Sequence, residues 1–197
     1  MISKGIDFKN FKIKKYNNNL KDYLKSILTS KNQVISSLSK SYKDNFSKKN
    51  IKHFNKKLDY RIIGMGGSTL GAQAIYDFLK KKIKKKFIFV DNLNAIKNKK
   101  TKKNLNNLII SKSGNTTETI VNANILVKKK DKNLFITEKK KSYLSLLAQK
   151  LKAEVVDHNN YIGGRYSVLS EVGMLPAELM GLNYKNFRQL NNLVKKI

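Results

Sequence analysis

The sequence predicts an α/β domain of the three-layer, doubly wound type, with a mainly parallel sheet of about five strands preceded by N-terminal helices. Two observations predict this fold class. From residue 60 onward, short apolar runs of strand length recur along the chain, and longer amphipathic segments separate them. Helices of that length between strands imply crossover connections, which give parallel strands covered on both faces.

Each apolar run is too short for a helix and rich enough in branched residues for a buried strand. The expected strands are 61–65, 87–91, 108–111, 134–137 and 154–156. The helical patterns between them cover 70–83, 117–129 and 142–151. The segment 91–107 is rich in Lys and Asn, and we expect it to be a loop with a single turn of helix.

The two ends of the chain differ in composition from the middle. Residues 1–58 are polar, with Leu20, Leu24 and Ile27 at helical spacing, and predict a helical segment packing on the domain. Residues 59–182 form the expected main domain. Residues 183–197 read as a C-terminal helix that ends in mid-pattern, so we expect a chain truncated before a second domain.

The one proline of the chain, Pro176, falls in an otherwise helical stretch, 167–180. Proline lacks a backbone N–H and its ring clashes with the preceding turn. We therefore expect the helix to kink or restart there.

The composition limits the class of protein and its partners. No cysteine and only two histidines make a structural metal site unexpected, and we expect no cofactor. No apolar stretch is long enough to span a membrane and the start lacks a signal-peptide core, so the expected location is cytoplasmic, without membrane partners.

A net charge of +29 raises nucleic acid as a partner. The lysines are spread along the whole chain, which weakens that interpretation. Their densest run, 80–86, lies where a helix should end, and cations are favourable at a helix C-terminus. A solvated helix end is the interpretation we favour, and nucleic-acid binding remains an alternative supported by charge alone.

The first motif is Gly-Met-Gly-Gly-Ser-Thr-Leu-Gly at 64–71, between an expected strand and an expected helix. Its glycines let the backbone turn sharply and approach a ligand, with Gly67 and Ser68 as candidate contacts. The spacing meets neither the dinucleotide-binding nor the P-loop pattern. The alternative is a glycine-rich turn that binds nothing.

The second motif, 111–119, also stands between a strand and a helix. Its five hydroxyl groups and the ammonium of Lys112 can surround a small dianion with hydrogen-bond donors. The alternative is ordinary capping, with Asn115 as N-cap and Glu118 completing a capping box. Lys112 can equally be one solvated lysine among many.

The third motif is Gly-Gly-Arg-Tyr-Ser-Val-Leu-Ser at 163–170. Two glycines allow a tight turn to present Arg165, one of only three arginines in a lysine-rich chain, toward the strand ends. Ser167 can cap the helix that follows. The alternative is a structural arginine that binds backbone carbonyls of the turn.

In this order, the three motifs resemble the glucose-6-phosphate isomerase family, which carries Gly-x-Gly-Gly-Ser-x-Leu-Gly, Ser-Lys-x-x-x-Thr-x-Glu-Thr and Gly-Gly-Arg-[Phe/Tyr]-Ser-Val-Leu-Ser. The similarity runs over 63–181, and Tyr166 stands where Phe is commoner. It implies a sugar isomerase (SIS) domain that binds glucose 6-phosphate and fructose 6-phosphate. The substrate-binding residues it implies are Gly67, Ser68, Ser111, Lys112, Ser113, Thr116 and, if it is not merely a cap, Glu118.

The resemblance also assigns Arg165 a catalytic place beside the reacting carbons, where its charge would stabilise an enediolate. Family members use a glutamate base, a histidine and a lysine from a later part of the chain, and form homodimers. Glu171 and Glu178 do not match the position of that base. We therefore expect weak sugar-phosphate binding and little or no turnover by this chain alone. A non-catalytic SIS module that senses a phosphosugar is the second interpretation.

Overall fold

The computed structural model describes residues 18–54, 58–93 and 105–190. The chain folds into two compact units. Of the described residues, the larger unit contains those between 43 and 184, and the smaller one contains 18–42 and 185–190. The domain boundaries expected from the sequence, at 58/59 and 182/183, stay a prediction.

The smaller unit is built from short helices. α1 (Asn18–Thr29) and α2 (Gln33–Ser37) come first. Asn32 caps α2, because its side-chain oxygen accepts a hydrogen bond of 2.8 Å from the amide of Val34. Arg188 donates from Nε to the carbonyl of Ser37 at 3.2 Å and stacks over the ring of Tyr42.

The C-terminal helix expected over 183–197 is a 3-10 helix, η4 (Tyr184–Leu190), as far as it is described. The rest of that expected helix lies outside the described residues. So do most of the expected loop, 91–107, and the first seventeen residues.

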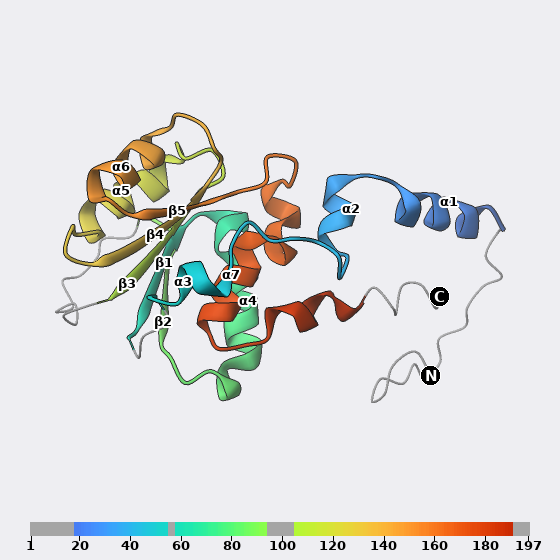
Figure 1. Cartoon of the computed structure of the whole chain (residues 1–197), viewed down its shortest axis with the longest axis horizontal. Coiled ribbons are helices and arrows are strands. Elements are labelled where there is room, and N and C mark those ends of the chain that lie inside the picture. Colours follow the sequence, from blue (N-terminus) through green and yellow to red (C-terminus); the bar gives the residue numbers. More distant parts are fainter. Residues whose placement is uncertain (1–17, 55–57, 94–104, 191–197) are drawn as a thin grey trace. The chain divides into compact units, whose positions relative to one another are not determined.

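The larger unit contains a five-stranded sheet in which every strand is parallel to its neighbours (Figure 1). The strand order is β2-β1-β3-β4-β5. All five strands expected from the sequence are confirmed, within two residues at their ends: β1 (Tyr60–Gly64), β2 (Phe87–Val90), β3 (Asn106–Ile110), β4 (Lys132–Thr137) and β5 (Glu154–Asp157).

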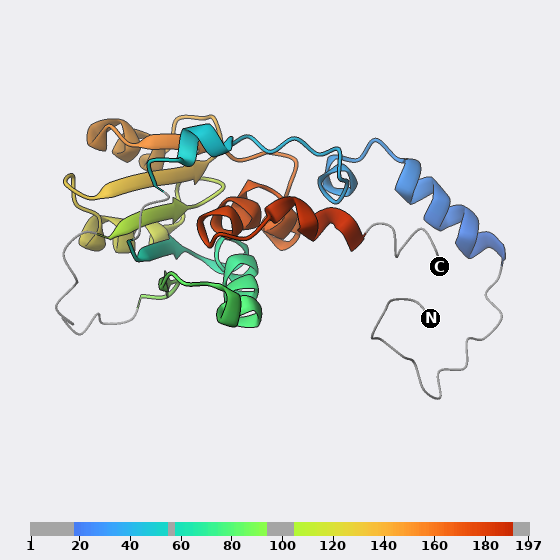
Figure 2. The ribbon, with the colours of Figure 1, turned by 60° about the horizontal axis from the view of Figure 1, so that its bottom comes forward.

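Helices cover both faces of the sheet, which confirms the three-layer doubly wound class (Figure 1). α5 (Thr117–Leu126) and α6 (Tyr143–Leu151) lie on one side, and α4 (Leu70–Leu79) and α7 (Glu171–Leu179) on the other. α4 and α7 are neighbours in both views (Figure 2). The short α3 (Lys48–Ile51) precedes the sheet in the sequence.

The helix expected over 167–180 is divided differently from the prediction. A 3-10 helix, η3 (Gly164–Leu169), comes first, and α7 starts after Ser170. Pro176 lies inside α7, which continues past it. The break therefore falls at Ser170, six residues before the proline that was expected to restart the helix.

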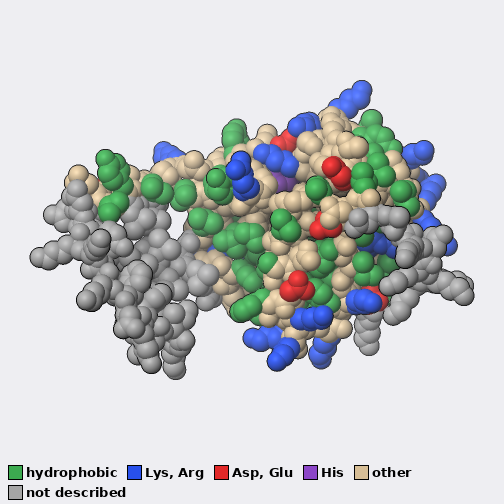
Figure 3. All heavy atoms as spheres, turned by 180° about the vertical axis from the view of Figure 1, so that it is seen from behind, with side chains coloured by type: hydrophobic (Ala, Val, Ile, Leu, Met, Phe, Trp, Pro, Cys, Tyr) green, Lys and Arg blue, Asp and Glu red, His purple; other side chains and the backbone are tan. Residues whose placement is uncertain are grey.

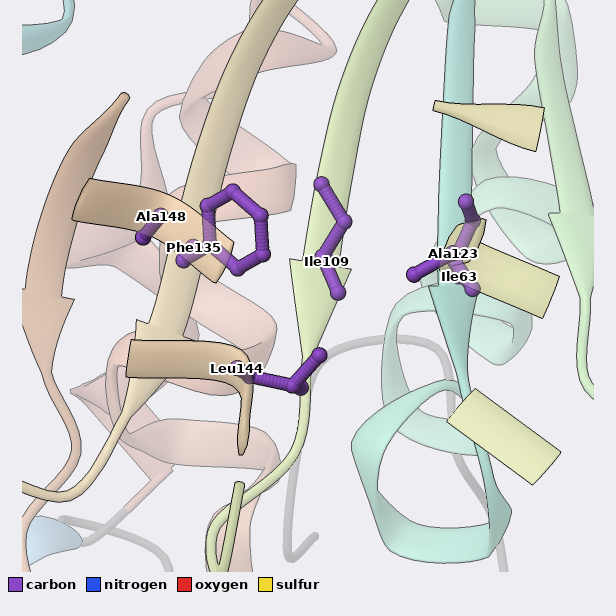
Figure 4. Packing of buried hydrophobic residues seen from close by; sticks show 6 residues of the cluster. All are labelled: Ile63, Ile109, Ala123, Phe135, Leu144 and Ala148. Carbon is purple, nitrogen blue, oxygen red and sulfur yellow. The ribbon is translucent and has the colours of Figure 1, made fainter. Parts of the chain in front are cut away.

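The core on the α5 and α6 side is a compact apolar cluster (Figure 4). Ile63, Ile109 and Phe135 project from three adjacent strands, and each is completely buried. The helices contribute the other three members of the cluster, Ala123 from α5 and Leu144 and Ala148 from α6. Burying a side chain of this size contributes about 1.5–3 kcal/mol, so this cluster fixes the strands that carry the loops described below.

The lysine run after α4 is largely solvated. Lys80–Lys82 form a 3-10 turn, η2, and all three side chains are exposed. Lys85 differs, because its ammonium donates to the carbonyl of Leu179 at 2.8 Å and so caps the end of α7. Burial lowers the pKa of Lys85, and the charge of Glu178 opposes that effect.

On the face shown in Figure 3, cationic side chains are spread over several elements and carboxylates lie among them. Within the described ranges no helix is long and apolar enough to cross a membrane. The same ranges hold no group of three or more His, Cys, Asp or Glu side chains arranged to bind a metal ion.

Candidate functional site

The chain changes direction across the sheet between β1 and β3, because β2 is added on one side of this pair and β4 on the other. The helix after β1, α4, and the helix after β3, α5, cover opposite faces of the sheet, so the loops that lead into them diverge at this point (Figure 1). Gly64 pairs with Ile110 at the carboxyl ends of these two strands. In doubly wound sheets, ligands bind outside the carboxyl ends at such a switch point. The first two motifs flank it.

The first and third motifs are in direct contact. Gly67 lies against Gly164 so closely that a Cβ added at Gly67 would be 2.3 Å from the Gly164 carbonyl oxygen. The hydroxyl of Ser167 donates to the Gly67 carbonyl at 3.2 Å and to that of Gly164 at 2.7 Å. Ser167 therefore joins two loops. The expectation that it caps the next helix is wrong, because the N-cap of α7 is Ser170.

The loop of the second motif is held by its own hydroxyl groups. Ser111 is buried, and its Oγ lies 2.9 Å from Oγ1 of Thr116 and accepts from the amide of Gly114 at 3.2 Å. The exposed Ser113 accepts from the amide of Asn115 at 3.2 Å. Gly114 has a φ of +68°, and a Cβ there would be 2.1 Å from Oγ of Ser142, so only glycine fits this turn.

The capping box expected at Asn115 and Glu118 does not form. The N-cap of α5 is Thr116, and it makes no side-chain capping hydrogen bond. Asn115 instead accepts from the amide of Tyr143 at 2.9 Å, so it is used between loops. Glu118 lies in the first turn of α5, half-buried, where a carboxylate is favourable to the helix dipole.

The helix N-termini at the switch point differ from the one after β4. Neither α4 nor α5 has a side-chain cap, whereas Ser142 and Ser145 form a complete capping box on α6. The first amides of a helix have no partner within the helix. At the switch point these donors and the positive ends of two helix dipoles are left for an anion.

Lys112 is engaged by its surroundings. Its ammonium donates to the Asn160 carbonyl at 2.6 Å and lies 3.6 Å from a carboxylate oxygen of Glu138. The Asn160 contact links the second motif to the segment that leads into the third. Burial alone would raise the pKa of Glu138, but Lys140, Lys112 and His158 hold it below its usual value.

Arg165 and Ser68 lie beside the contact between Gly67 and Gly164. Each is the next residue after one of these glycines, and Arg165 is exposed while Ser68 is half-buried. Neither side chain makes a hydrogen bond or ion pair with any part of the chain that the structure describes. Both have polar groups available for a ligand at this edge of the sheet.

A family relationship accounts for this combination of loops. The phosphoglucose isomerase family model matches residues 15–197. The chain belongs to the phosphoglucose isomerase family.

Curated glucose-6-phosphate isomerases are similar to this chain over part of their length. The chain is 38% identical over 143 residues to the glucose-6-phosphate isomerase of Acholeplasma laidlawii, covering 62% of this chain and 33% of that one. It is 36% identical over 134 residues to the enzyme of Methanocaldococcus jannaschii, with 62% and 33% coverage. The chain thus spans about a third of the length of these phosphoglucose isomerase relatives.

Solved structures share the SIS-type fold at low identity. The tagatose-6-phosphate ketose/aldose isomerase of Escherichia coli superposes with a TM-score of 0.54 at 16% identity, covering 87% of this chain and 48% of that one. The NanR protein of Vibrio vulnificus, solved with ManNAc-6P, gives 0.54 at 18% identity, with 90% and 67% coverage. These likenesses concern the fold.

Sequence reasoning missed the residues that hold Lys112 and the loops in place. Glu138 follows the carboxyl end of β4, the same edge as the three motifs, so its position alone could have flagged it. His158 follows β5 in the same way and is buried, which lowers its pKa. No sequence signal identified Asn160 as the partner of Lys112, because it accepts through its backbone.

Proposed function

We propose that the chain carries the phosphate-binding part of a glucose-6-phosphate isomerase site and binds glucose 6-phosphate and fructose 6-phosphate at the β1/β3 switch point. The observation that carries this proposal is the pair of helix N-termini without side-chain caps at that edge of the sheet. A sugar phosphate is a dianion, and open helix amides with hydroxyl donors suit it. Family membership favours these two substrates over other phosphosugars.

In this proposal the second motif binds the phosphate. Ser113 and Thr116 supply hydroxyl groups beside the first amides of α5, and buried Ser111 holds the loop in its turn. Lys112 joins the phosphate shell by leaving the Asn160 carbonyl, and Glu118, in the first turn of α5, is proposed to contact the substrate. Gly67 and Ser68 are proposed to contact the sugar.

Arg165 is proposed to face the reacting carbons. Isomerisation moves a proton between C1 and C2 through an enediolate, and a fixed guanidinium stabilises its negative charge. A carboxylate base must also remove and return the proton. The base is proposed to come from the part of the family's chain that has no counterpart among these residues, so the chain alone binds substrate and turns over little or none.

The cellular setting follows from the same proposal. The pathway is glycolysis and gluconeogenesis, where these two sugar phosphates are interconverted, and the location is the cytoplasm. The homodimer implied by the resemblance remains a prediction. The strongly basic composition leaves nucleic-acid binding as a weaker alternative, which a flat salt titration with DNA would eliminate.

Titration calorimetry with glucose 6-phosphate and with glucose tests the binding proposal. We expect heat of binding for the phosphate ester only, because the site is built around the dianion. Equal affinity for glucose would contradict this assignment. An isomerase assay of the chain alone should give a rate far below that of a full-length relative, and a comparable rate would show that a base is present.

A phosphosugar sensor of SIS type is the second candidate, and the NanR structure with ManNAc-6P makes it concrete. A hydroxamate analogue of the enediolate separates the two. An isomerase site should bind the analogue about 100-fold or more tighter than substrate. Replacing Arg165 by Gln should abolish that preference while leaving glucose 6-phosphate binding within about threefold, because the phosphate ligands remain. Equal affinity for analogue and substrate would favour the sensor.

A further inference from the structure

A cavity lies along the edge strand of the sheet, beside α6. It is bounded by the end of β4 and the segment after it, by β5 and by α6, and its volume is about 530 Å³. Small-molecule sites usually have volumes of about 300–1,000 Å³. β5 is the edge strand, separated from β1 by β3 and β4. The cavity adjoins the second motif, because the hydroxyl of its lining residue Thr137 donates to the Lys112 carbonyl at 3.3 Å, but none of the candidate substrate-binding residues lines it.

One wall of the cavity is apolar and open to solvent. Leu146 of α6 is 49% exposed and Val155 of β5 is 41% exposed, and both line the cavity. Val155 belongs to β5, the edge strand, and no described strand lies beyond it. Covering apolar surface of this kind is favourable, so the wall suits an apolar group of a ligand.

The rim of the cavity carries an excess of positive charge. Three consecutive lysines, Lys139–Lys141, line it together with two carboxylates, Glu138 and Asp157. Glu138 is already compensated, at 2.5 Å by Lys140 and at 3.6 Å by Lys112 from outside the cavity. Lys139 and Lys141 make no ion pair or hydrogen bond in the part of the chain that the structure describes, and Asp157 makes no ion pair there. Two uncompensated cations thus face one uncompensated carboxylate.

We propose that this cavity binds an amphipathic anion, in which a phosphate or carboxylate group contacts Lys139 and Lys141 and an aromatic or aliphatic body covers Leu146 and Val155. Glucose 6-phosphate does not fit this description, because its hydroxyl groups would lose water against an apolar wall. The cavity is therefore a second site with a different ligand class from the switch point.

Methyl NMR of Leu146 and Val155 tests the proposal on the whole chain. The probes are phenyl phosphate, benzoate and benzyl alcohol, which share a ring and differ in the head group. Both anions should shift these two methyl signals in the millimolar range, and benzyl alcohol should shift them at least about fivefold more weakly, as expected for the loss of an ion pair. Absence of any shift, or equal shifts with benzyl alcohol, would overturn the proposal.

Charge variants make the test specific to the rim. The double change Lys139→Gln and Lys141→Gln should weaken phenyl phosphate binding by roughly three- to thirtyfold, and Asp157→Asn should tighten it by roughly two- to fivefold. If the double lysine change does not weaken binding, or if Asp157→Asn does not tighten it, the assigned contacts are wrong. Glucose 6-phosphate should leave both methyl signals unchanged and retain its affinity in all these variants, so this result is independent of the proposed sugar-phosphate site.

Discussion

Replacing Gly67 by Ala should push apart the two loops that meet beside Arg165. The new Cβ would lie 2.3 Å from the Gly164 carbonyl oxygen and 2.5 Å from its carbon, both backbone atoms. Real Cβ contacts essentially never fall below 3.0 Å, so the carbonyl must retreat by about 0.7 Å, the difference between 3.0 and 2.3 Å. Overpacking of this kind costs about 1–3 kcal/mol of unfolding free energy.

The same displacement should weaken ligand binding. Ser167 anchors both loops, with hydrogen bonds to the carbonyls of Gly67 and Gly164, so the strain cannot be relieved without moving Arg165 or Ser68. Losing one neutral hydrogen bond of about 1 kcal/mol, that of Ser68 to the sugar, raises the dissociation constant of glucose 6-phosphate by roughly fivefold.

Gly163→Ala is the matched control for this change. Its added Cβ would meet only Cδ2 of Tyr166, at 3.9 Å, and the backbone φ of −70° accepts any residue. Its stability should stay within about 0.5 kcal/mol of the parent. Denaturant unfolding and calorimetry measure both effects. If Gly67→Ala unfolds at the same denaturant concentration as Gly163→Ala, the two loops are not in contact in solution and the site as described is wrong.

Two further predictions concern the core and the pH dependence of stability. Leu144→Ala should lower the unfolding free energy by about 2–5 kcal/mol, because Leu144 of α6 is completely buried in the apolar cluster. Leu146→Ala on the same helix should lower it much less, because Leu146 is 49% exposed. Denaturant midpoints of the two variants compare them, and equal losses would refute the assigned faces of α6. Burial lowers the pKa of His158 below its usual 6.5, so the unfolded chain takes up a proton at higher pH than the folded one and stability is lost as pH falls below about 6.5. Between about pH 7.5 and about pH 5.5, the unfolding free energy should fall less steeply in His158→Gln than in His53→Gln. If the pH dependence in His158→Gln equals that of the unchanged chain, His158 is not a buried neutral imidazole.

The fold was predictable because its strongest signals are local. The three central strands contain the apolar runs Ile62–Ile63, Leu108–Ile110 and Leu134–Ile136, and a strand buried on both faces needs no alternation. The positions of the three motifs followed from strand ends, since the carboxyl ends of parallel strands share one edge of the sheet.

The failures came from polar groups whose partners are distant in sequence. Asn115 carries a good local capping signal, but its side-chain oxygen binds the amide of Tyr143, twenty-eight residues away. Ser167 likewise uses its hydroxyl on Gly67, a hundred residues earlier, and the helix starts later than expected. A capping pattern describes what a side chain can do for its own segment, and it does not include competition from loops that the fold brings alongside.

The same limit applies to Lys112 among the candidate site residues. Its residue type predicted a phosphate ligand, yet its present partners, the Asn160 carbonyl and Glu138, come from segments that only the sheet brings together. Its role with a ligand remains a prediction, and it depends on how readily the ammonium leaves these partners.

An amide NMR map of the chain titrated with glucose 6-phosphate tests the central claim most directly. We predict that the largest shifts fall together in the three loops, at 66–69, 111–119 and 163–167, and that glucose without phosphate leaves the second loop unchanged. Shifts confined to one loop, or centred on the lysine-rich segments away from the β1/β3 edge, would contradict the claim that these loops form a single anion site.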